Sequence, residues 1–172
     1  MAMGAVPPPT DRLAFREMTA DDLDLMESLL GDPTVMWVNP RAWTRDEVRR
    51  WIDRNEHEYR ERGFGLWIVT ERATGAFVGE CGLTKQVFAG TSEIEVGYQL
   101  RPEFWGRGLA TEAAAACVAF GRDVAGLDRI VALIDPRNEA SKRVAAKIGL
   151  TWERDVPVPG KTLGVYGTRF AA

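Results

Sequence analysis

The sequence of 172 residues predicts one α/β domain built around a mixed α+β sheet. Its first half contains a strand and two helices, followed by three strands joined by short turns, which is the pattern of an antiparallel meander. Its second half alternates strands with helices and contains a dense apolar run over 129–134, as expected for a strand buried on both faces. Hydrophobic residues make up 45% of the chain and charged residues 27%, a balance that excludes collagen-like, disordered and membrane-embedded proteins.

The first ten residues are expected to form a flexible tail, followed by a single domain over 11–172. Pro7, Pro8 and Pro9 can join neither a helix nor the interior of a sheet. The N-terminal stretch lacks the charged and apolar regions of a signal peptide, and no segment approaches the ~18 apolar residues of a membrane span. We therefore expect a cytoplasmic protein without a membrane partner.

A strand and two helices follow the tail. Residues 12–18 alternate in polarity and predict the strand. The first helix is expected over 19–30. The second is expected over 44–62, where Thr44 and Glu47 have the spacing of a capping box. One stripe of the second helix contains Val48, Trp51, Ile52, Asn55 and Tyr59.

Three strands of the meander are expected over 65–71, 76–85 and 92–100. A hairpin loop joins the first two and ends at Gly75, where a positive φ is needed. The third strand alternates regularly but contains Gly97, which indicates a bulge or a close backbone approach.

Two helices and three strands complete the expected domain. The helices are predicted over 109–125 and 138–148, the second with Asn138 as its N-cap, and the strands over 129–134, 151–154 and 164–170. The apolar stripe of the first of these helices contains Leu109, Ala113, Cys117, Phe120 and Val124.

A loop with two closely spaced glycines runs from the strand ending at Leu100 into the next helix. Backbone N–H groups around Gly106 and Gly108, together with the helix N-terminus, favour the binding of a phosphate. Arg101 and Arg107 flank the loop and are expected to neutralise such a ligand. The loop matches neither a P-loop nor the GxGxxG fingerprint, so a nucleotide-binding scaffold of another family is a weak alternative.

Charge and cysteine content exclude further classes. The net charge is −3, which argues against a nucleic-acid partner. The two cysteines, Cys81 and Cys117, cannot form a disulfide framework and are interpreted as core residues rather than nucleophiles. His57, the only histidine, is interpreted as a solvated surface residue. No metal site is expected.

The stretch WGRGLATEA, which starts at Trp105, resembles the acyl-CoA-binding motif [QR]-x-x-G-x-[GA] of the GCN5-related N-acetyltransferases (GNAT). Tryptophan at the first position departs from the general motif and resembles the branch that acetylates the N-termini of ribosomal proteins. The segments LAFREMTADDLDLM, FVGECGL, IEVGYQL and LDRIVALIDPRNEASKRVAAKIGL and the final strand occur in that branch's order along the chain, so the resemblance covers nearly the whole chain. It implies the GNAT fold, in which the strands over 92–100 and 129–134 splay apart and the pantetheine arm of the cofactor inserts between them.

The resemblance also implies acetyl-CoA as co-substrate and a set of residues that bind it. Asn138 matches an asparagine that contacts the cofactor arm, and Lys142 and Arg143 are expected near the 3′-phosphate. A backbone N–H near Gln99 or Leu100 would polarise the thioester carbonyl. The full set implied for cofactor binding is Gln99, Leu100, Trp105, Gly106, Arg107, Gly108, Leu109, Ala110, Asn138 and Arg143.

The family mechanism implies direct attack of an amine on the thioester without an acyl-enzyme. Glu95 and Glu93 are the candidates for the base, and Glu95 is favoured. Ser141 is the candidate acid, with solvent as the alternative, because Ala145 occupies the place of the family's frequent tyrosine. Deprotonating an α-amine near neutral pH costs about 1 kcal/mol, whereas a lysine side chain costs about 4 kcal/mol.

The favoured acceptor is a protein N-terminus, by resemblance to the branch. A small-molecule amine, such as a polyamine or an aminoglycoside, is the alternative enzyme substrate, and a catalytically silent acyl-CoA-binding module is the alternative of another class. Trp37 and Trp43 lie in the loop between the first two helices and either line an acceptor pocket or pack within the loop. Family members are often monomers or dimers, so the resemblance implies a monomer or a homodimer.

Overall fold

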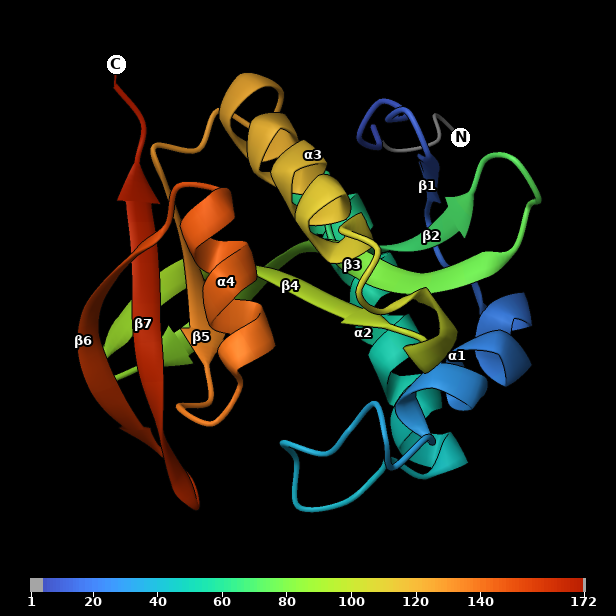
Figure 1. Cartoon of the computed structure of the whole chain (residues 1–172), viewed down its shortest axis with the longest axis horizontal. Coiled ribbons are helices and arrows are strands. Elements are labelled where there is room, and N and C mark those ends of the chain that lie inside the picture. Colours follow the sequence, from blue (N-terminus) through green and yellow to red (C-terminus); the bar gives the residue numbers. More distant parts are fainter. Residues whose placement is uncertain (1–4, 172) are drawn as a thin grey trace.

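The computed structural model describes residues 5–171; residues 1–4 and 172 lie outside the described part of the chain. Its strands form one sheet and are β1 (Leu13–Arg16), β2 (Leu66–Glu71), β3 (Phe77–Phe88), β4 (Thr91–Leu100), β5 (Arg129–Ile134), β6 (Thr151–Val158) and β7 (Lys161–Arg169). Its helices are α1 (Leu23–Leu30), α2 (Arg45–Arg62), α3 (Leu109–Asp123) and α4 (Glu139–Lys147), with 3₁₀ turns η1 (Ala20–Asp22) and η2 (Pro102–Phe104). The strand order β1-β2-β3-β4-β5-β7-β6 confirms the predicted α/β fold with a mixed sheet (Figure 1).

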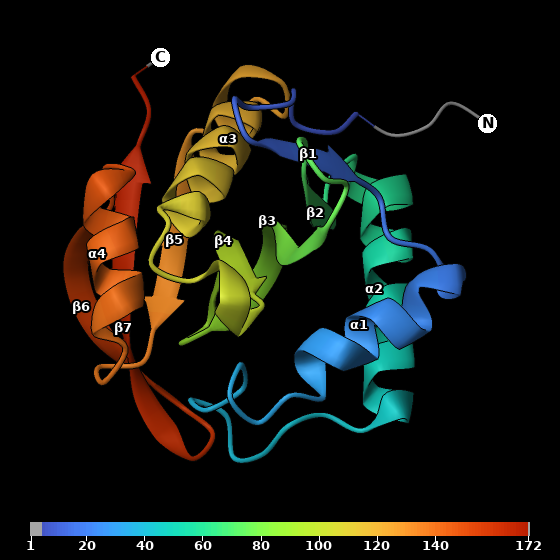
Figure 2. The same ribbon diagram turned by 45° about the vertical axis from the view of Figure 1, so that its right-hand side comes forward.

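Helices cover both faces of the sheet, as Figures 1 and 2 show. Consecutive residues of a strand point to opposite faces, and β3 shows this at Glu80 and Cys81. Glu80 accepts a hydrogen bond from Trp51 of α2, whereas Cys81 contacts Cys117 of α3. Helices α2 and α3 therefore lie on opposite faces of the sheet.

The first two helices follow the sequence prediction closely. Thr44 and Glu47 form the expected capping box of α2, and Gly63, with φ 77°, ends this helix. The first expected helix begins with the 3₁₀ turn η1 and becomes α-helical at Leu23. In the predicted stripe of α2, only Trp51 is half-buried instead of buried, because it lines the cavity described below.

The meander of β2, β3 and β4 is antiparallel as predicted, and Gly75 has the expected positive φ of 73°. The interpretation of Gly97 was wrong. Gly97 pairs in register with Gly82, and a Cβ atom at Gly97 would meet only the Leu66 side chain, at 3.7 Å, which is an ordinary contact. The close backbone approach is at Gly82 instead, where a Cβ atom would lie 2.1 Å from the carbonyl oxygen of Gly65.

Strands β4 and β5 splay apart as the resemblance implied. They are parallel and share a single register pair, Glu95 with Val131, whereas β3 and β4 pair over their whole contact from Gly79 and Leu100 to the hairpin turn. Beyond Glu95, no described strand pairs with β4 on its β5 side. The splay opens the sheet in its middle, between the two halves of the fold.

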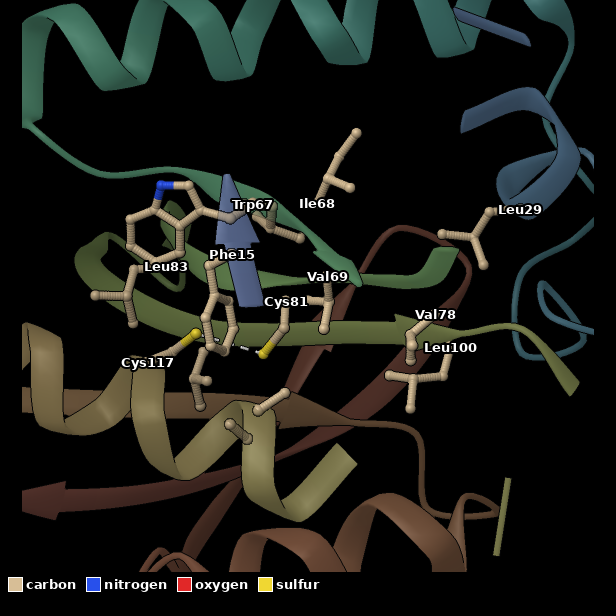
Figure 3. Close-up of a cluster of buried hydrophobic side chains, with 14 of the residues drawn as sticks. Phe15, Leu29, Trp67, Ile68, Val69, Val78, Cys81, Leu83, Leu100 and Cys117 are labelled. Carbon is tan, nitrogen blue, oxygen red and sulfur yellow. Dashed lines mark hydrogen bonds between the residues drawn. The ribbon is translucent and has the colours of Figure 1, made fainter. Parts of the chain in front are cut away.

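The core packs on both sides of the central strands (Figure 3). Trp67 is fully buried and meets the Phe120 ring edge-on, with the ring centroids 5.0 Å apart. Cys81 and Cys117 are fully buried free thiols with their sulfur atoms 3.6 Å apart, as expected for core residues. Val124 was wrongly assigned to the core stripe. It is 59% exposed because α3 ends at Asp123.

The start of the described chain contacts the domain. Residues 5–10 contain neither helix nor strand, yet Pro7 is buried and Thr10 Oγ1 donates a hydrogen bond to Glu112 of α3 at 2.6 Å. Flexibility of the tail stays a prediction, and its residues 1–4 lie outside the described range. Within residues 5–171, no helix is long and apolar enough to cross a membrane. The cytoplasmic location also stays a prediction.

Candidate active site

A cavity of about 1130 Å³ opens where β4 and β5 diverge. Its walls come from these two strands, from the turn leading into α3, from α4 and from the loop between α1 and α2. The lining includes most of the residues proposed above for catalysis or cofactor binding, whereas Glu93, Arg101, Arg107 and Lys142 do not line the cavity. The lining members are Glu95, Gln99, Leu100, Trp105, Gly106, Gly108, Leu109, Ala110, Asn138, Ser141 and Arg143. Residues far apart in the sequence are thus brought to one place, while their roles stay predictions.

The turn over 105–110, called the glycine loop below, forms one end of the cavity. Gly106 and Gly108 have φ values of 71° and 75°, which favour glycine, and Gly108 is the N-cap of α3. A Cβ atom at Gly106 would meet nothing within 4 Å. The first N–H groups of an α-helix have no partner inside the helix, so those of Leu109 and Ala110 are available to an anion.

Trp105 holds the glycine loop to the end of β4. Its indole N–H donates a hydrogen bond to the carbonyl oxygen of Leu100 at 2.7 Å, while the ring remains 47% exposed at the cavity. The tryptophan that departs from the family motif therefore has a positioning contact of its own.

The two arginines expected to neutralise a phosphate are engaged elsewhere. Arg107 forms an ion pair with Glu71 at 2.6 Å, and Arg101 forms one with Glu103 at 2.9 Å. Neither residue lines the cavity, and their role in neutralising a phosphate stays a prediction. Arg107 therefore contributes its backbone, and not its side chain, to the glycine loop.

Helix α4 contributes positive charge to the cavity, as do Arg54, Arg137 and Lys161 from other segments. Arg143 and Lys147 line the cavity. Lys142, the other candidate near the 3′-phosphate, pairs with Glu139 at 2.7 Å and does not line the cavity.

Glu95 lies at the single register pair between β4 and β5, where the strands separate. Burial raises the pKa of Glu95 to about 7, although its carboxylate accepts hydrogen bonds from Gln86 Nε2 at 2.9 Å and from the Leu133 N–H at 3.2 Å. A carboxylate with a pKa near the working pH is suited to accept a proton and to release it again.

Glu93, the other candidate base, has a different environment. Both of its carboxylate oxygens accept hydrogen bonds from Arg129 Nε, at 3.0 and 3.1 Å, and it does not line the cavity. Arg129 binds Glu153 as well, at 2.7 Å. The contacts of Glu93 are those of a structural ion pair, which supports the choice of Glu95.

The start of α4 places a hydroxyl group in the cavity. Asn138 caps the helix as predicted, because its Oδ1 accepts a hydrogen bond from the Ser141 N–H at 3.1 Å. Ser141 Oγ has no hydrogen-bond partner among the described residues. Tyr98 of β4 donates its hydroxyl to the Ser141 carbonyl oxygen at 3.3 Å, and burial raises the pKa of Tyr98 to about 12. The sequence interpretation missed Tyr98, which occupies an apolar position in the alternation of its strand.

Aromatic side chains and a buried carboxyl group form the other end of the cavity. The rings of Trp43 and Trp51 meet edge-on, with centroids 5.4 Å apart, and Trp51 Nε1 donates a hydrogen bond to Glu80 Oε2 at 2.9 Å. Glu80 is fully buried without an ion pair among residues 5–171, and burial raises its pKa to about 7. The sequence interpretation missed Glu80 altogether and assigned Trp51 to the core.

The loop between α1 and α2 forms a wall at this end. Trp37 is 47% exposed and lies beneath the guanidinium of Arg137, 5.6 Å from the ring centroid. Lys161 Nζ of β7 donates a hydrogen bond to the Val38 carbonyl oxygen at 3.0 Å, so the loop meets the β6–β7 hairpin (Figure 2). Both Trp37 and Trp43 line the cavity, which supports the pocket interpretation over plain loop packing.

Groups outside the cavity add little chemistry. His57 is exposed on α2, as predicted. Over the described residues 5–171, no group of three or more His, Cys, Asp or Glu side chains is placed to hold a metal ion.

Comparison with known proteins places this geometry in a family. The model of the acetyltransferase (GNAT) domain matches residues 12–151. The chain is 35% identical over 158 residues to the protein YkkB of Bacillus subtilis, covering 91% of this chain and 92% of that one. It is also 33% identical over 169 residues to an FsC-acetyl coenzyme A-N(2)-transacetylase of Aspergillus fumigatus, covering 88% and 70%.

A solved structure shows the same fold. The ribosomal L7/L12 α-N-protein acetyltransferase RimL, in complex with coenzyme A, superimposes with a TM-score of 0.76 at 17% identity. The superposition covers 96% of this chain and 98% of RimL.

Proposed function

The chain belongs to the GNAT acetyltransferase family, and from this membership we propose that it transfers an acetyl group from acetyl-CoA to a primary amine, with a protein N-terminal α-amine as the favoured acceptor. The observation that carries the proposal is a single cavity that contains both the glycine loop and Glu95. One end offers donors for an anionic co-substrate, and the other offers a base poised near neutral pH.

The chemistry of acetyl-CoA fits the residues present. Its pyrophosphate needs N–H donors, which the glycine loop and the first turn of α3 supply, and Arg143 adds positive charge. Its pantetheine arm carries amide groups that pair like a strand, and β4 has no described strand partner on its β5 side beyond Glu95. Gln99 and Leu100 lie on this open stretch of β4.

The reaction is a direct transfer. Glu95 takes a proton from the acceptor ammonium, directly or through water, and the neutral amine attacks the thioester carbonyl carbon. A backbone N–H near Gln99 or Leu100 stabilises the developing oxyanion. As the C–N bond forms, the attacking nitrogen loses its second proton to solvent and the C–S bond breaks. The Ser141 hydroxyl gives the leaving thiolate a proton that solvent replaces.

The raised pKa of Glu95 supports an α-amine as acceptor. A base with a pKa of about 7 is only about one unit below an α-amine, whose pKa is ~8, but more than three units below a lysine amine at ~10.4. Proton transfer to Glu95 is therefore close to balanced for the first amine and costs several kcal/mol for the second. RimL, which shares the fold, is by its description an α-N-protein acetyltransferase.

A small-molecule amine is the second candidate acceptor. The relative from Aspergillus fumigatus is described as an FsC-acetyl coenzyme A-N(2)-transacetylase, and this chain covers 70% of its length. The aromatic wall of Trp37, Trp43 and Trp51 is also compatible with a compact organic acceptor.

Release of free CoA in the presence of a panel of amines tests the function. The panel contains peptides with a free N-terminus, the same peptides with an acetylated N-terminus and an internal lysine, small polyamines and aminoglycosides, and no amine. We expect turnover above the amine-free rate with free N-termini. Turnover with small amines alone would transfer the proposal to the second candidate, and binding of acetyl-CoA without turnover would indicate a silent module.

A glycine substitution tests the cofactor end separately. Gly108→Trp places a bulky side chain at a positive φ in the glycine loop, and we expect the affinity for acetyl-CoA to fall by a hundredfold or more in calorimetric titration. Gly126→Trp is the matched control, because Gly126 also has a positive φ, 66°, but follows the opposite end of α3. Equal loss of affinity in both variants would contradict the assignment of the glycine loop.

A further inference from the structure

We infer that Arg12, immediately before β1, is a positioning residue that holds the glycine loop in the conformation that binds the pyrophosphate. The inference rests on the proposed function, because it assigns the loop to acetyl-CoA. Arg12 itself lies outside the cavity lining, so its effect acts through the loop.

Arg12 connects the two sides of the glycine loop. Its Nη1 donates a hydrogen bond to the Arg107 carbonyl oxygen at 2.9 Å. Its Nε and Nη2 contact Glu112 Oε2 at 2.7 and 2.6 Å, and its backbone N–H donates to Glu112 Oε1 at 2.9 Å. A single guanidinium thus joins the middle of the loop to the first turn of α3.

The segment that carries Arg12 is itself fixed to the domain. Thr10 Oγ1 donates a hydrogen bond to Glu112 Oε1 at 2.6 Å and accepts one from the Leu13 N–H at 3.0 Å. Arg72, in the β2–β3 hairpin loop, donates from Nη1 to the Thr10 carbonyl oxygen at 2.7 Å and from its backbone N–H to the Arg12 carbonyl oxygen at 2.8 Å. The guanidinium therefore extends from a well-anchored backbone.

The bond to the Arg107 carbonyl determines where the next N–H points. In a trans peptide the carbonyl oxygen of one residue and the N–H of the next point in opposite directions, and the described residues contain no cis peptide. Because Arg12 holds the Arg107 carbonyl toward β1, the Gly108 N–H points away from Arg12. Loss of this bond would let the peptide rotate, which glycine at position 108 allows.

The pair with Glu112 has a second consequence. A carboxylate in the first turn of α3 lies close to the helix N-terminus, where the proposed ligand also carries negative charge. Arg12 covers this carboxylate with two contacts and so reduces its repulsion of the ligand.

The experiment compares two acetyl donors in the full-length enzyme. Acetyl-CoA carries the pyrophosphate, whereas S-acetylpantetheine lacks it but has the same thioester and the same arm. For Arg12→Met we expect kcat/KM with acetyl-CoA to fall about tenfold, the factor typical of losing a charge-assisted hydrogen bond, while kcat/KM with S-acetylpantetheine changes less than twofold. Arg12→Lys retains the charge without the planar fork and should recover part of the loss.

Arg122→Met is the matched control. Arg122 pairs with Asp123 at 2.6 Å at the opposite end of α3, and both side chains are exposed. This variant should keep both kcat/KM values. If Arg12→Met folds poorly, Glu112→Gln gives a second test, because it removes the carboxylate charge that pairs with Arg12 while leaving an oxygen acceptor. It too should lower kcat/KM with acetyl-CoA and leave kcat/KM with S-acetylpantetheine unchanged.

Two results would overturn the inference: an equal loss with both donors, which indicates a general structural role, and no loss with acetyl-CoA. Failure of the proposed function has a different signature, because the parent enzyme would then bind and use neither donor. The comparison of parent and variants therefore separates the two hypotheses.

Discussion

At the cofactor end of the cavity the groups available to a ligand belong mainly to the backbone, whereas at the acceptor end they belong to side chains. The glycine loop presents N–H groups from consecutive residues, and its shape depends on the positive φ values of Gly106 and Gly108. The acceptor end assembles Trp43, Trp51 and Glu80 from a loop, a helix and a strand.

The two ends of the cavity also differ in their effect on the stability of the folded state. Glu80 and Glu95 are carboxyl groups whose pKa burial raises to about 7, so their ionised forms destabilise the folded state. The glycine loop contains no such group, because a helix N-terminus attracts anions through groups that the helix leaves unpaired anyway. Binding of the acetyl donor thus uses backbone groups that the fold leaves unpaired, whereas binding of the acceptor and proton transfer require buried carboxyl groups whose ionised forms lower stability.

Replacing Glu95 should give the largest effect and should act on the acceptor end alone. For Glu95→Gln we expect kcat to fall about a thousandfold, within the range of general-base catalysis, while the affinity for acetyl-CoA in calorimetric titration stays within twofold. In the parent enzyme the rate rises as pH increases through about 7, where Glu95 loses its proton. This inflection should be absent from the pH profile of the variant.

Glu93→Gln is the control for this variant. Glu93 lies two residues away on the same face of β4, but Arg129 neutralises it and retains Glu153 as a partner when Glu93 is changed. We expect kcat within about threefold of the parent. A large loss in Glu93→Gln with little change in Glu95→Gln would reverse the assignment of the base.

Replacing Glu80 should show by how much a buried charge lowers the stability of the folded state. Its pKa rises from about 4.5 in the unfolded chain to about 7 in the folded one, so between these pH values the folded state binds more protons. Stability is therefore lost as pH increases from about 4.5 to 7, by about 3 kcal/mol in total, and stays level above. Glu80→Gln keeps an acceptor for Trp51 Nε1 and removes the charge.

We expect Glu80→Gln to be more stable than the parent at pH 8, and the difference to shrink as pH falls to 5. Urea unfolding at several pH values measures it. A constant difference across this range would show that Glu80 is ionised at pH 5 as well, which would contradict the effect of burial on its pKa.

The same contrast explains which parts of the molecule the sequence could predict. The glycine loop, its helix and the N-cap Asn138 lie within short stretches whose residue types report local geometry, so local patterns were sufficient to find them. The splay of β4 and β5 came only from the resemblance, because no local pattern reports which strands fail to pair.

At the acceptor end, the sequence placed Trp37 and Trp43 as candidate pocket residues, but Glu80 and Trp51 were missed because they look like core residues. Glu80 occurs in an apolar run, and Trp51 continues the apolar stripe of α2; their contact, between residues far apart in the sequence, exists only after folding. Charge pairing was missed for the same reason. Arg107, which was expected near a phosphate, forms an ion pair at 2.6 Å with Glu71, a residue distant in the sequence.

The smallest effects should come from the two hydroxyl groups between the ends. If Ser141 gives the leaving thiolate its proton, Ser141→Ala lowers kcat about tenfold, less than general acids often contribute, because a thiol with a pKa of ~8.5 leaves readily without help. Tyr98→Phe removes a bond to the Ser141 carbonyl oxygen but leaves the Ser141 hydroxyl in place, so we expect less than a threefold loss. Single-turnover rates of CoA release measure both. A larger loss in Tyr98→Phe would assign the proton to Tyr98, whose hydroxyl remains protonated at neutral pH because burial raises its pKa to about 12.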